Sequence, residues 1–275
     1  METASSTSSV TLVELKRSSL IPPLWEDSVR VLNISECKAA GLSLAHAFAD
    51  DDLAQYLVNP DDVADLPAED KWKIHVDFYT YMVAATCCNG VAIAIGPDYE
   101  GVALWLPPRK NLDGWWTSFR SGLWRLKFQL SAEGNKRYDD LVHVLHDTKS
   151  EVLGDRDDEA WYLLYLGTKP GARGKGYARK LLDFMIQRAD AEQAPIYLES
   201  TTQSNNRYYS KFGFEAKRDI CLTRGLSPVG LSIMVRDPQP LPQMRKVEVA
   251  YPGGGTALPA SAPIKMIQGS RKKMG

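Results

Sequence analysis

The sequence lacks an excess of charge, a long apolar run and a spaced set of cysteines. Its 33 Lys and Arg residues nearly balance 34 Asp and Glu residues, which gives a formal net charge of -1. A dedicated nucleic-acid surface normally shows as a basic excess, and no apolar run approaches the roughly twenty residues that a membrane span requires. We therefore expect neither a nucleic-acid partner nor a membrane partner.

The cysteines and the first ten residues argue against a protein stabilised by zinc or disulfides and against a secreted protein. The four cysteines, Cys37, Cys87, Cys88 and Cys221, form no C-x-x-C pair, so they indicate neither a zinc site nor a disulfide framework. We expect reduced thiols and no bound metal. The first ten residues contain neither a basic leader nor an apolar segment of a secretory signal. The sequence therefore predicts a cytoplasmic protein.

Composition divides the chain into three parts. Residues 1–27 are rich in Ser and Thr and then in Pro, and predict an N-terminal extension. In residues 237–275 Pro and Gly accumulate, which is typical of a flexible C-terminal extension. Residues 28–236 between them are long enough to bury a core, and predict a single domain.

Hydrophobic periodicity predicts a mixed α/β (α+β) fold for this domain. Residues 29–32, 91–95 and 102–106 alternate as strands, and two amphipathic helices separate the first strand from the other two. Residues 111–153 hold a group of aromatic residues and then a polar segment with helical spacing. We interpret this part as two helices inserted ahead of the next strand.

The stretch from Trp161 to Phe214 is the most informative. A hydrophobic run, W-Y-L-L-Y-L, leads into the turn G-A-R-G-K-G from Gly171 to Gly176, and a segment with helical periodicity follows. Glycines and cations thus stand where a helix begins. Because the first turn of a helix leaves its N–H groups unpaired and carries the positive dipole end, the pattern indicates a pyrophosphate site.

Spacing separates the glycine loops that could serve such a site. A P-loop requires Ser or Thr after Gly-Lys, but Gly176 follows Lys175. A dinucleotide fingerprint requires a third glycine where Arg179 stands. The remaining sequence, R-G-K-G-Y-A, fits [QR]-x-x-G-x-[GA] and resembles the acetyl-CoA-binding turn of the GCN5-related N-acetyltransferases (GNAT superfamily). An ordinary basic loop is the alternative interpretation.

A second motif strengthens the resemblance. The superfamily carries N-x-x-x-Y-x-x-x-G-F on the helix after the next strand, and Asn205, Tyr209, Gly213 and Phe214 match it in order and spacing. The segments Y-L-L-Y-L-G-T-K-P and Y-L-E-S are similar to motifs of the puromycin N-acetyltransferase-like branch. The resemblance is firm from about residue 160 to 235 and absent at both ends.

The resemblance implies a fold and a cofactor site. The expected fold is a mixed, mostly antiparallel twisted sheet of six to seven strands, splayed at the cofactor site and flanked by helices. The expected cofactor is acetyl-CoA, with no metal. In this family a β-bulge leaves backbone donors free, here near Leu164. The implied cofactor-binding residues are Leu166, Gly167, Thr168, Arg173, Gly174, Lys175, Gly176, Tyr177, Ala178 and Asn205.

The catalytic and acceptor residues follow from the same resemblance. Tyr209 matches the tyrosine beside the thioester sulfur and is the candidate general acid, because a phenol is protonated at neutral pH; helix packing alone would also explain it. Glu199, near the end of a strand, is the candidate base, and a solvated glutamate is the alternative. On the acceptor side we expect acidic residues and tryptophans, namely Asp50, Asp51, Asp52, Trp105, Trp115, Trp116 and Trp124. A solvated acidic surface and tryptophans packed in the core are the alternatives.

The resulting hypothesis is an acetyl-CoA-dependent N-acetyltransferase that acetylates a primary amine of a small molecule by direct attack in a ternary complex. Two alternatives remain open. A protein or peptide acetyltransferase would need an open groove, and a non-catalytic acyl-CoA-binding module would keep the turn without the chemistry. A homodimer is compatible with this fold, although no hydrophobic seam in the sequence identifies one.

Overall fold

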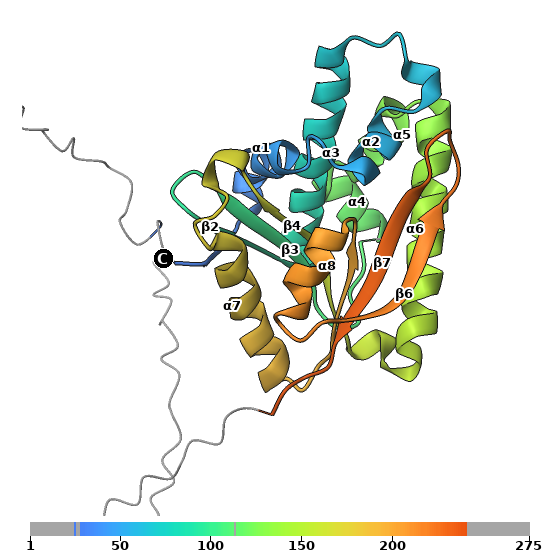
Figure 1. Cartoon of the computed structure of the whole chain (residues 1–275). Helices are drawn as coiled ribbons and strands as arrows, with labels where there is room; N and C mark the ends of the chain where they lie inside the picture. Colours follow the sequence, from blue (N-terminus) through green and yellow to red (C-terminus); the bar gives the residue numbers. More distant parts are fainter. Residues whose placement is uncertain (1–24, 26–27, 113, 241–275) are drawn as a thin grey trace, which may run out of the picture. The chain divides into compact units, whose positions relative to one another are not determined.

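A computed structural model describes Trp25, residues 28–112 and residues 114–240. Most of both predicted extensions therefore lies outside the described residues. Within them, a seven-stranded sheet is flanked by helices (Figure 1). The strands are β1 (Arg30–Val31), β2 (Val91–Ile95), β3 (Gly101–Leu106), β4 (Trp161–Thr168), β5 (Ile196–Ser200), β6 (Glu215–Leu222) and β7 (Val229–Arg236). The helices are α1 (Cys37–Ala47), α2 (Asp52–Val58), α3 (Ala68–Asn89), α4 (Trp115–Ser121), α5 (Leu126–Gln129), α6 (Ala132–Leu153), α7 (Tyr177–Ala191) and α8 (Gln203–Ser210).

The sheet has the order β1-β2-β3-β4-β5-β7-β6, and every neighbouring pair is antiparallel except β4 and β5. The parallel pair is short, because the register runs only from Trp161 opposite Ile196 to Leu163 opposite Leu198. Beyond that point both strands continue without pairing to each other. The predicted fold, a mostly antiparallel sheet splayed at one place, is thus confirmed.

A β-bulge lies where the two strands separate. Leu104 of β3 is opposite Tyr165, whereas the next residue, Trp105, is opposite Leu163. Leu164 is therefore the extra residue on β4. A bulge bends a strand and leaves its extra residue outside the ladder, which explains why β4 turns away from β5 at this residue.

The two faces of the sheet carry different helices. On one face α7 buries Leu181, Leu182, Met185 and Ala189 against the sheet, all four with no exposed surface. Their i, i+1, i+4, i+8 spacing places them on one face of the helix, as the sequence predicted. Each fully buried Leu or Met contributes roughly 1.5–3 kcal/mol of transfer free energy. The other face packs against α1, α3 and α6.

Three helices, α1, α2 and α3, lie between β1 and β2, where the sequence predicted two; α2 is the additional helix. Asp51 is the N-cap of this helix, and its carboxylate accepts hydrogen bonds from the backbone N–H of Leu53 at 3.0 Å and of Ala54 at 3.1 Å. Such a cap satisfies donors that the first turn leaves unpaired. The run Asp50 to Asp52 therefore begins a helix and does not merely end the previous one.

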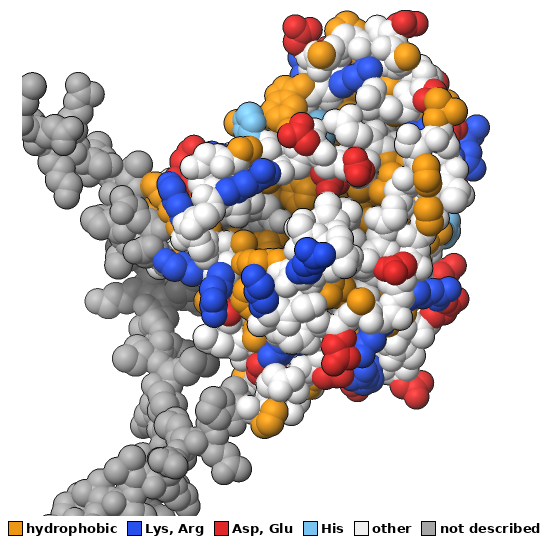
Figure 2. Space-filling view, viewed as in Figure 1, with side chains coloured by type: hydrophobic (Ala, Val, Ile, Leu, Met, Phe, Trp, Pro, Cys, Tyr) orange, Lys and Arg blue, Asp and Glu red, His pale blue; other side chains and the backbone are white. Residues whose placement is uncertain are grey.

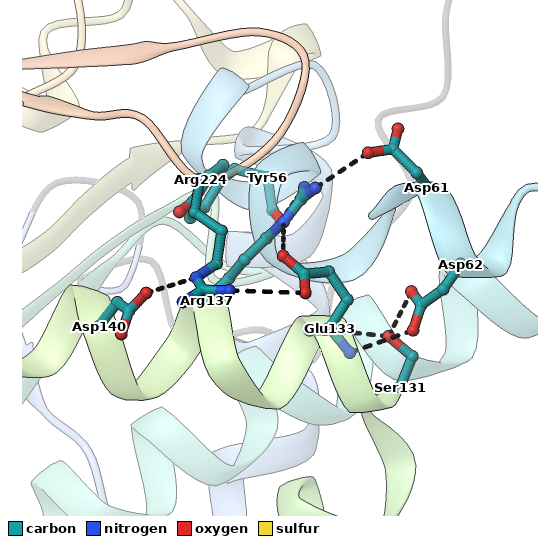
Figure 3. A network of polar contacts seen from close by, with 9 residues as sticks. Tyr56, Asp61, Asp62, Ser131, Glu133, Arg137, Asp140 and Arg224 are labelled. Atoms are coloured by element: carbon teal, nitrogen blue, oxygen red, sulfur yellow. Dashed lines mark hydrogen bonds and ion pairs between the residues drawn. The ribbon is translucent and has the colours of Figure 1, made fainter.

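A polar network fixes α6 to its surroundings (Figure 3). The buried guanidinium of Arg137 donates to the Tyr56 carbonyl at 3.1 Å and to the carboxylates of Asp61 and Glu133, each at 3.3 Å. Arg224, between β6 and β7, contacts Asp140 on the same helix. The network joins α2, α6 and the β6–β7 connection, so that α6 is held as a wall beside the sheet.

Candidate active site

A cavity of about 340 Å³ lies where β4 and β5 separate. Residues from α2, α3 and α6 and from both strands line it. Figure 2 shows the molecule hollowed in this region, with hydrophobic and acidic side chains inside the hollow and Lys and Arg side chains beside it. Seven Phe and Tyr residues contribute to the lining, namely Phe48, Phe78, Tyr79, Tyr138, Tyr162, Tyr165 and Tyr209.

Glu199 stands at the wall of this cavity, one residue after the last residue of β5 that pairs with β4. The Tyr162 hydroxyl donates a hydrogen bond to its Oε1 at 2.9 Å. Burial raises the pKa of Glu199 to about 7, although the bond from Tyr162 stabilises the ionised form. A carboxylate with this pKa changes protonation state near neutral pH, as a general base should.

Tyr209 reaches the same cavity from α8. Its ring packs against Phe214 at 5.7 Å between centroids and belongs to the core beneath α7. Burial raises the pKa of this phenol, so it remains protonated at neutral pH. The preceding residue, Tyr208, packs against Phe212 at 5.2 Å and does not line the cavity. The two neighbouring tyrosines therefore have different surroundings.

The turn before α7 has the backbone that the glycines suggested. Gly174 and Gly176 have φ of 84° and 80°, a region that residues with a Cβ adopt only at a cost of roughly 1–2 kcal/mol. Gly176 is the N-cap of α7 and offers no side chain to cap its first turn. Lys and Arg side chains gather over this end of α7 in Figure 2.

The side chains of this turn are arranged around the open helix end. Arg173 and Lys175 are exposed, and Arg173 donates to the Ala47 carbonyl of α1 at 3.2 Å. The Tyr177 ring is buried in the core, with the Lys175 Nζ 5.9 Å from its centroid. Ala178 follows in the first turn of α7. An anion placed here would lie at the positive end of the helix dipole, close to two cations.

The three β4 residues expected at the cofactor differ in surroundings. Leu166 lines the cavity. Gly167 lies under α1, where a Cβ would approach side-chain atoms of Leu44 and Ala47 to 2.9 Å, so the glycine is required by close packing. Thr168 pairs with Gly101 at the end of β4.

Asn205 lines the cavity from α8. Thr202, three residues earlier, is the N-cap of that helix, and its hydroxyl accepts from the Asn205 backbone N–H at 3.2 Å. Helix capping therefore does not explain this asparagine side chain.

Of the seven residues predicted on the acceptor side, the structure brings Asp51 to the cavity and places the other six outside its lining. Asp51 lines the cavity, and its second oxygen accepts from the Thr201 hydroxyl at 3.0 Å. Asp50 is exposed and outside the lining. Trp105 was wrongly placed by the sequence, because its side chain faces α7 and is fully buried with Ile93 and Ile95. Trp115, Trp116 and Trp124 are exposed and also lie outside the lining.

The aromatic residues that do form the wall were missed. Tyr165 makes an edge contact with Tyr79 at 5.3 Å, and Phe48 stacks on Tyr79 at 5.4 Å. The sequence alone does not distinguish them from core residues, because aromatic residues at helical spacing, such as those of α3, are also typical of a buried core. Among the residues that the structure describes, no group of three or more His, Cys, Asp and Glu side chains could hold a metal ion.

Comparison with known proteins agrees with this geometry. Residues 139–216 match the family model of the acetyltransferase (GNAT) domain. The chain is 37% identical over 235 residues to an uncharacterized N-acetyltransferase of Schizosaccharomyces pombe, covering 85% of this chain and 92% of that protein.

Solved structures share the fold at low sequence identity. A mosquito arylalkylamine N-acetyltransferase like 5b is 14% identical with a TM-score of 0.52, and a Drosophila melanogaster polyamine N-acetyltransferase is 13% identical with a TM-score of 0.51. Each alignment covers 76% of this chain and 99% of the other. The fold and the site define an acyltransferase that modifies nitrogen. The chain belongs to the GCN5-related N-acetyltransferase family, and is an N-acetyltransferase.

Proposed function

We propose that this N-acetyltransferase transfers the acetyl group of acetyl-CoA to the primary amine of a small molecule with an apolar, preferably aromatic, body. The observation that carries the proposal is Glu199, a carboxylate with a pKa of about 7 that faces an aromatic-lined cavity at the separation of β4 and β5. The same cavity extends to Tyr209. A base and an acid thus share one cavity.

The open end of α7 fits the pyrophosphate of acetyl-CoA. Gly174 and Gly176 bring backbone N–H groups to the surface without a Cβ, and Arg173 and Lys175 add positive charge. Binding energy obtained there holds the thioester in place, which lowers the entropy cost of the reaction. The bulge at Leu164 interrupts the ladder next to the cavity, where backbone donors are suited to a thioester oxygen.

In the proposed reaction the acceptor enters as an ammonium ion, and Glu199 removes its proton. The amine nitrogen then attacks the thioester carbonyl carbon, forming the C–N bond in a ternary complex. As the C–S bond breaks, the Tyr209 phenol donates its proton to the departing thiolate. The nitrogen loses its remaining extra proton to the phenolate, which gives the neutral amide and restores Tyr209, and Glu199 releases the first proton to solvent. The buried phenol is protonated at neutral pH, and the carboxyl group is partly ionised there, so each group is available in the form that its role requires.

The lining indicates the class of acceptor. Tyr79, Tyr138 and Tyr165 supply rigid ring surface, and Asp51 supplies a carboxylate that can attract a cation. Aromatic pairs contribute about 0.5–1.5 kcal/mol beyond area burial, which favours an aromatic amine over an aliphatic one. A peptide would need an open groove, whereas this cavity is bordered by α2, α3 and α6.

The test is an acetylation assay with the full chain, acetyl-CoA and a panel of aralkylamines, polyamines and lysine peptides. We expect thiol release with the aralkylamines, at a kcat/KM about tenfold above that of polyamines, consistent with the aromatic contribution. Higher kcat/KM with peptides would favour the protein acetyltransferase. Binding of acetyl-CoA without thiol release from any amine would favour the non-catalytic module.

A further inference from the structure

Helix α4 has the reverse of the usual amphipathic arrangement. It turns Thr117 and Ser121 toward the protein, where both are buried, and it packs beside α3. Its large aromatic side chains face outward, with exposed fractions of 78% for Trp115, 54% for Trp116 and 65% for Phe119. Surface helices normally bury such residues. Packing among the residues that the structure describes therefore does not account for these three rings.

The next turns continue the pattern. Leu126 and Leu130 are buried, whereas Trp124 and Phe128 are 45% and 79% exposed. The rings lie close to one another along the chain, since Trp116 stacks on Phe119 at 6.3 Å and Trp124 meets Phe128 at 6.0 Å. We call the set Trp115, Trp116, Phe119, Trp124 and Phe128 the aromatic surface. Contiguous exposed apolar residues of this kind mark an interaction site.

The charges of the same segment have one sign. Residues 114–130 contain Arg120, Arg125 and Lys127 and no Asp or Glu. Arg109 and Lys110 precede them in the sequence, with Asp113 in between, and all five cations are exposed. Arg109 and Lys110 also line the cavity. Within the residues that the structure describes, none of the five takes part in an ion pair.

We propose that the aromatic surface and its cations bind the surface of an anionic phospholipid bilayer. Trp and Phe rings are stable at the boundary between head groups and acyl chains, and unpaired Lys and Arg attract anionic head groups. Both requirements meet here on one segment. None of the helices in the described part of the chain is long and apolar enough to cross a membrane. The sequence predicted no membrane partner because it has no apolar run long enough to span a bilayer; the proposal departs from that prediction, because binding at the surface requires no span.

Membrane binding is more consistent with these observations than contact with a second copy of the chain. Two copies related by a twofold axis would bring the cations of one surface close to those of the other, because the same patch faces itself. Like charges at such an interface oppose association. An anionic bilayer instead complements the charge and accepts the rings.

The experiment measures sedimentation of the full chain with vesicles of phosphatidylcholine alone and of phosphatidylcholine with phosphatidylserine. The aromatic variant carries Trp115→Ser, Trp116→Ser and Phe119→Ser, and the charge variant carries Arg120→Gln, Arg125→Gln and Lys127→Gln. Leu226→Ser, at an 88% exposed residue of the β6–β7 connection, is the control for the first. Lys38→Gln, Lys71→Gln and Lys211→Gln together remove the same charge elsewhere and control for the second.

We expect binding to the phosphatidylserine vesicles, a blue shift of tryptophan emission and weakening by salt. The charge variant should lose on the order of 100-fold in partitioning, since each cation near such a surface contributes about 1 kcal/mol. The aromatic variant should also lose binding, while both controls keep it. Equal binding by the variants and controls, or no vesicle binding by the unaltered chain, would overturn the proposal. A dimer in solution that only the aromatic variant abolishes, without lipid binding, would also overturn it.

Discussion

At the scale of single residues, the environment of Glu199 decides what its carboxyl group can do. A solvated glutamate is ionised at neutral pH and is a weak base, whereas the cavity wall raises the pKa of Glu199 to about 7. The hydrogen bond from Tyr162 limits the shift because it stabilises the ionised form. The two effects leave the group poised near neutrality, which favours the basic role over the solvated one.

Glu199→Gln should lower kcat/KM about 100-fold or more, since that is the usual contribution of a positioned general base. For the unaltered enzyme kcat/KM should rise with pH and level off above about pH 7, as the carboxyl group ionises. The variant should lose this step. Steady-state kinetics from pH 5.5 to about 9 checks both points, and an unchanged pH profile would assign the base elsewhere.

The same substitution should have the opposite effect on stability. Because the folded-state pKa of Glu199 lies above its usual value of 4.5, the folded protein holds its proton more tightly than the unfolded chain. Stability from this group is complete below about pH 4.5 and is lost as pH rises through about 7. Glu199→Gln should therefore unfold at equal or higher urea concentration than the unaltered protein at pH 8. A clear decrease would show that the charge stabilises the fold.

Tyr209→Phe should reduce kcat about 100-fold, in the range for a lost general acid, with little change in KM for acetyl-CoA. The ring remains to pack on Phe214, so the fold should be unaffected. Tyr208→Phe is the matched control, because it removes the same hydroxyl from the neighbouring residue outside the cavity. Equal losses in both variants would mean that the hydroxyl of Tyr209 donates no proton.

Residue types alone predicted only part of the site. Tyr209 and Glu199 follow a spaced motif, and the structure brings both to the cavity. Trp105 illustrates the limit: on β3 neighbouring side chains point to opposite faces, and Trp105 shares with Ala103 the face that α7 covers. Which face α7 covers depends on the packing of elements distant in the sequence. The residues around Trp105 carry no local signal for it.

At the scale of elements, the unit of β4, turn and α7 holds the information that the sequence expresses most directly. Its helix periodicity and its glycines are local properties, and the structure has both the buried stripe and the positive φ values. The separation of β4 from β5 is not local, since it depends on where pairing stops. Helix α4 is likewise unpredictable from periodicity, because its apolar residues face away from the protein.

Gly174→Ala and Gly176→Ala should each raise KM for acetyl-CoA about tenfold, because a left-handed residue with a Cβ costs roughly 1–2 kcal/mol or relaxes the turn. A Cβ would meet no atom within 4 Å at either glycine, so backbone strain and not crowding is tested. Gly171→Ala is the control, since it also has open space and no positive φ. Similar KM values for all three variants would show that the turn does not bind acetyl-CoA.

At the scale of the whole domain, one buried ion pair joins the last strand to the cofactor-side helix. Arg236 of β7 donates to both carboxylate oxygens of Asp190 in α7, at 2.6 Å and 2.9 Å, and to the Phe212 carbonyl at 2.8 Å. Both side chains are nearly inaccessible to solvent. The partners are far apart in sequence, so no local pattern predicts the contact. It connects α7, the segment after α8 and the end of the sheet.

Asp190→Asn should lower the free energy of unfolding by about 3–5 kcal/mol, because it leaves the Arg236 charge buried without its partner. Asp183→Asn on the same helix, where the carboxylate is half exposed and 3.5 Å from Arg179, should cost less than about 1 kcal/mol. Urea unfolding of the two variants at pH 7 gives this comparison. A similar small loss in both would show that the pair contributes little.

The ion pair of Asp190 and Arg236 should also determine how steeply stability falls at acidic pH. Burial disfavours the Asp190 charge, but hydrogen bonds from Arg236 and from the Gln239 N–H hold its pKa below the usual 3.8. The stabilisation is therefore present above about pH 4 and is lost as pH falls through the lowered pKa. Asp190→Asn should remove this dependence, so that the stability of the variant falls less steeply below pH 4 than that of the unaltered protein.

Because a buried pair is often replaced by apolar side chains at little cost, the combination Asp190→Leu with Arg236→Met should recover most of the loss at pH 7. Failure to recover it would mean that the bond from Arg236 to Phe212, and not the charge pair, holds these elements together.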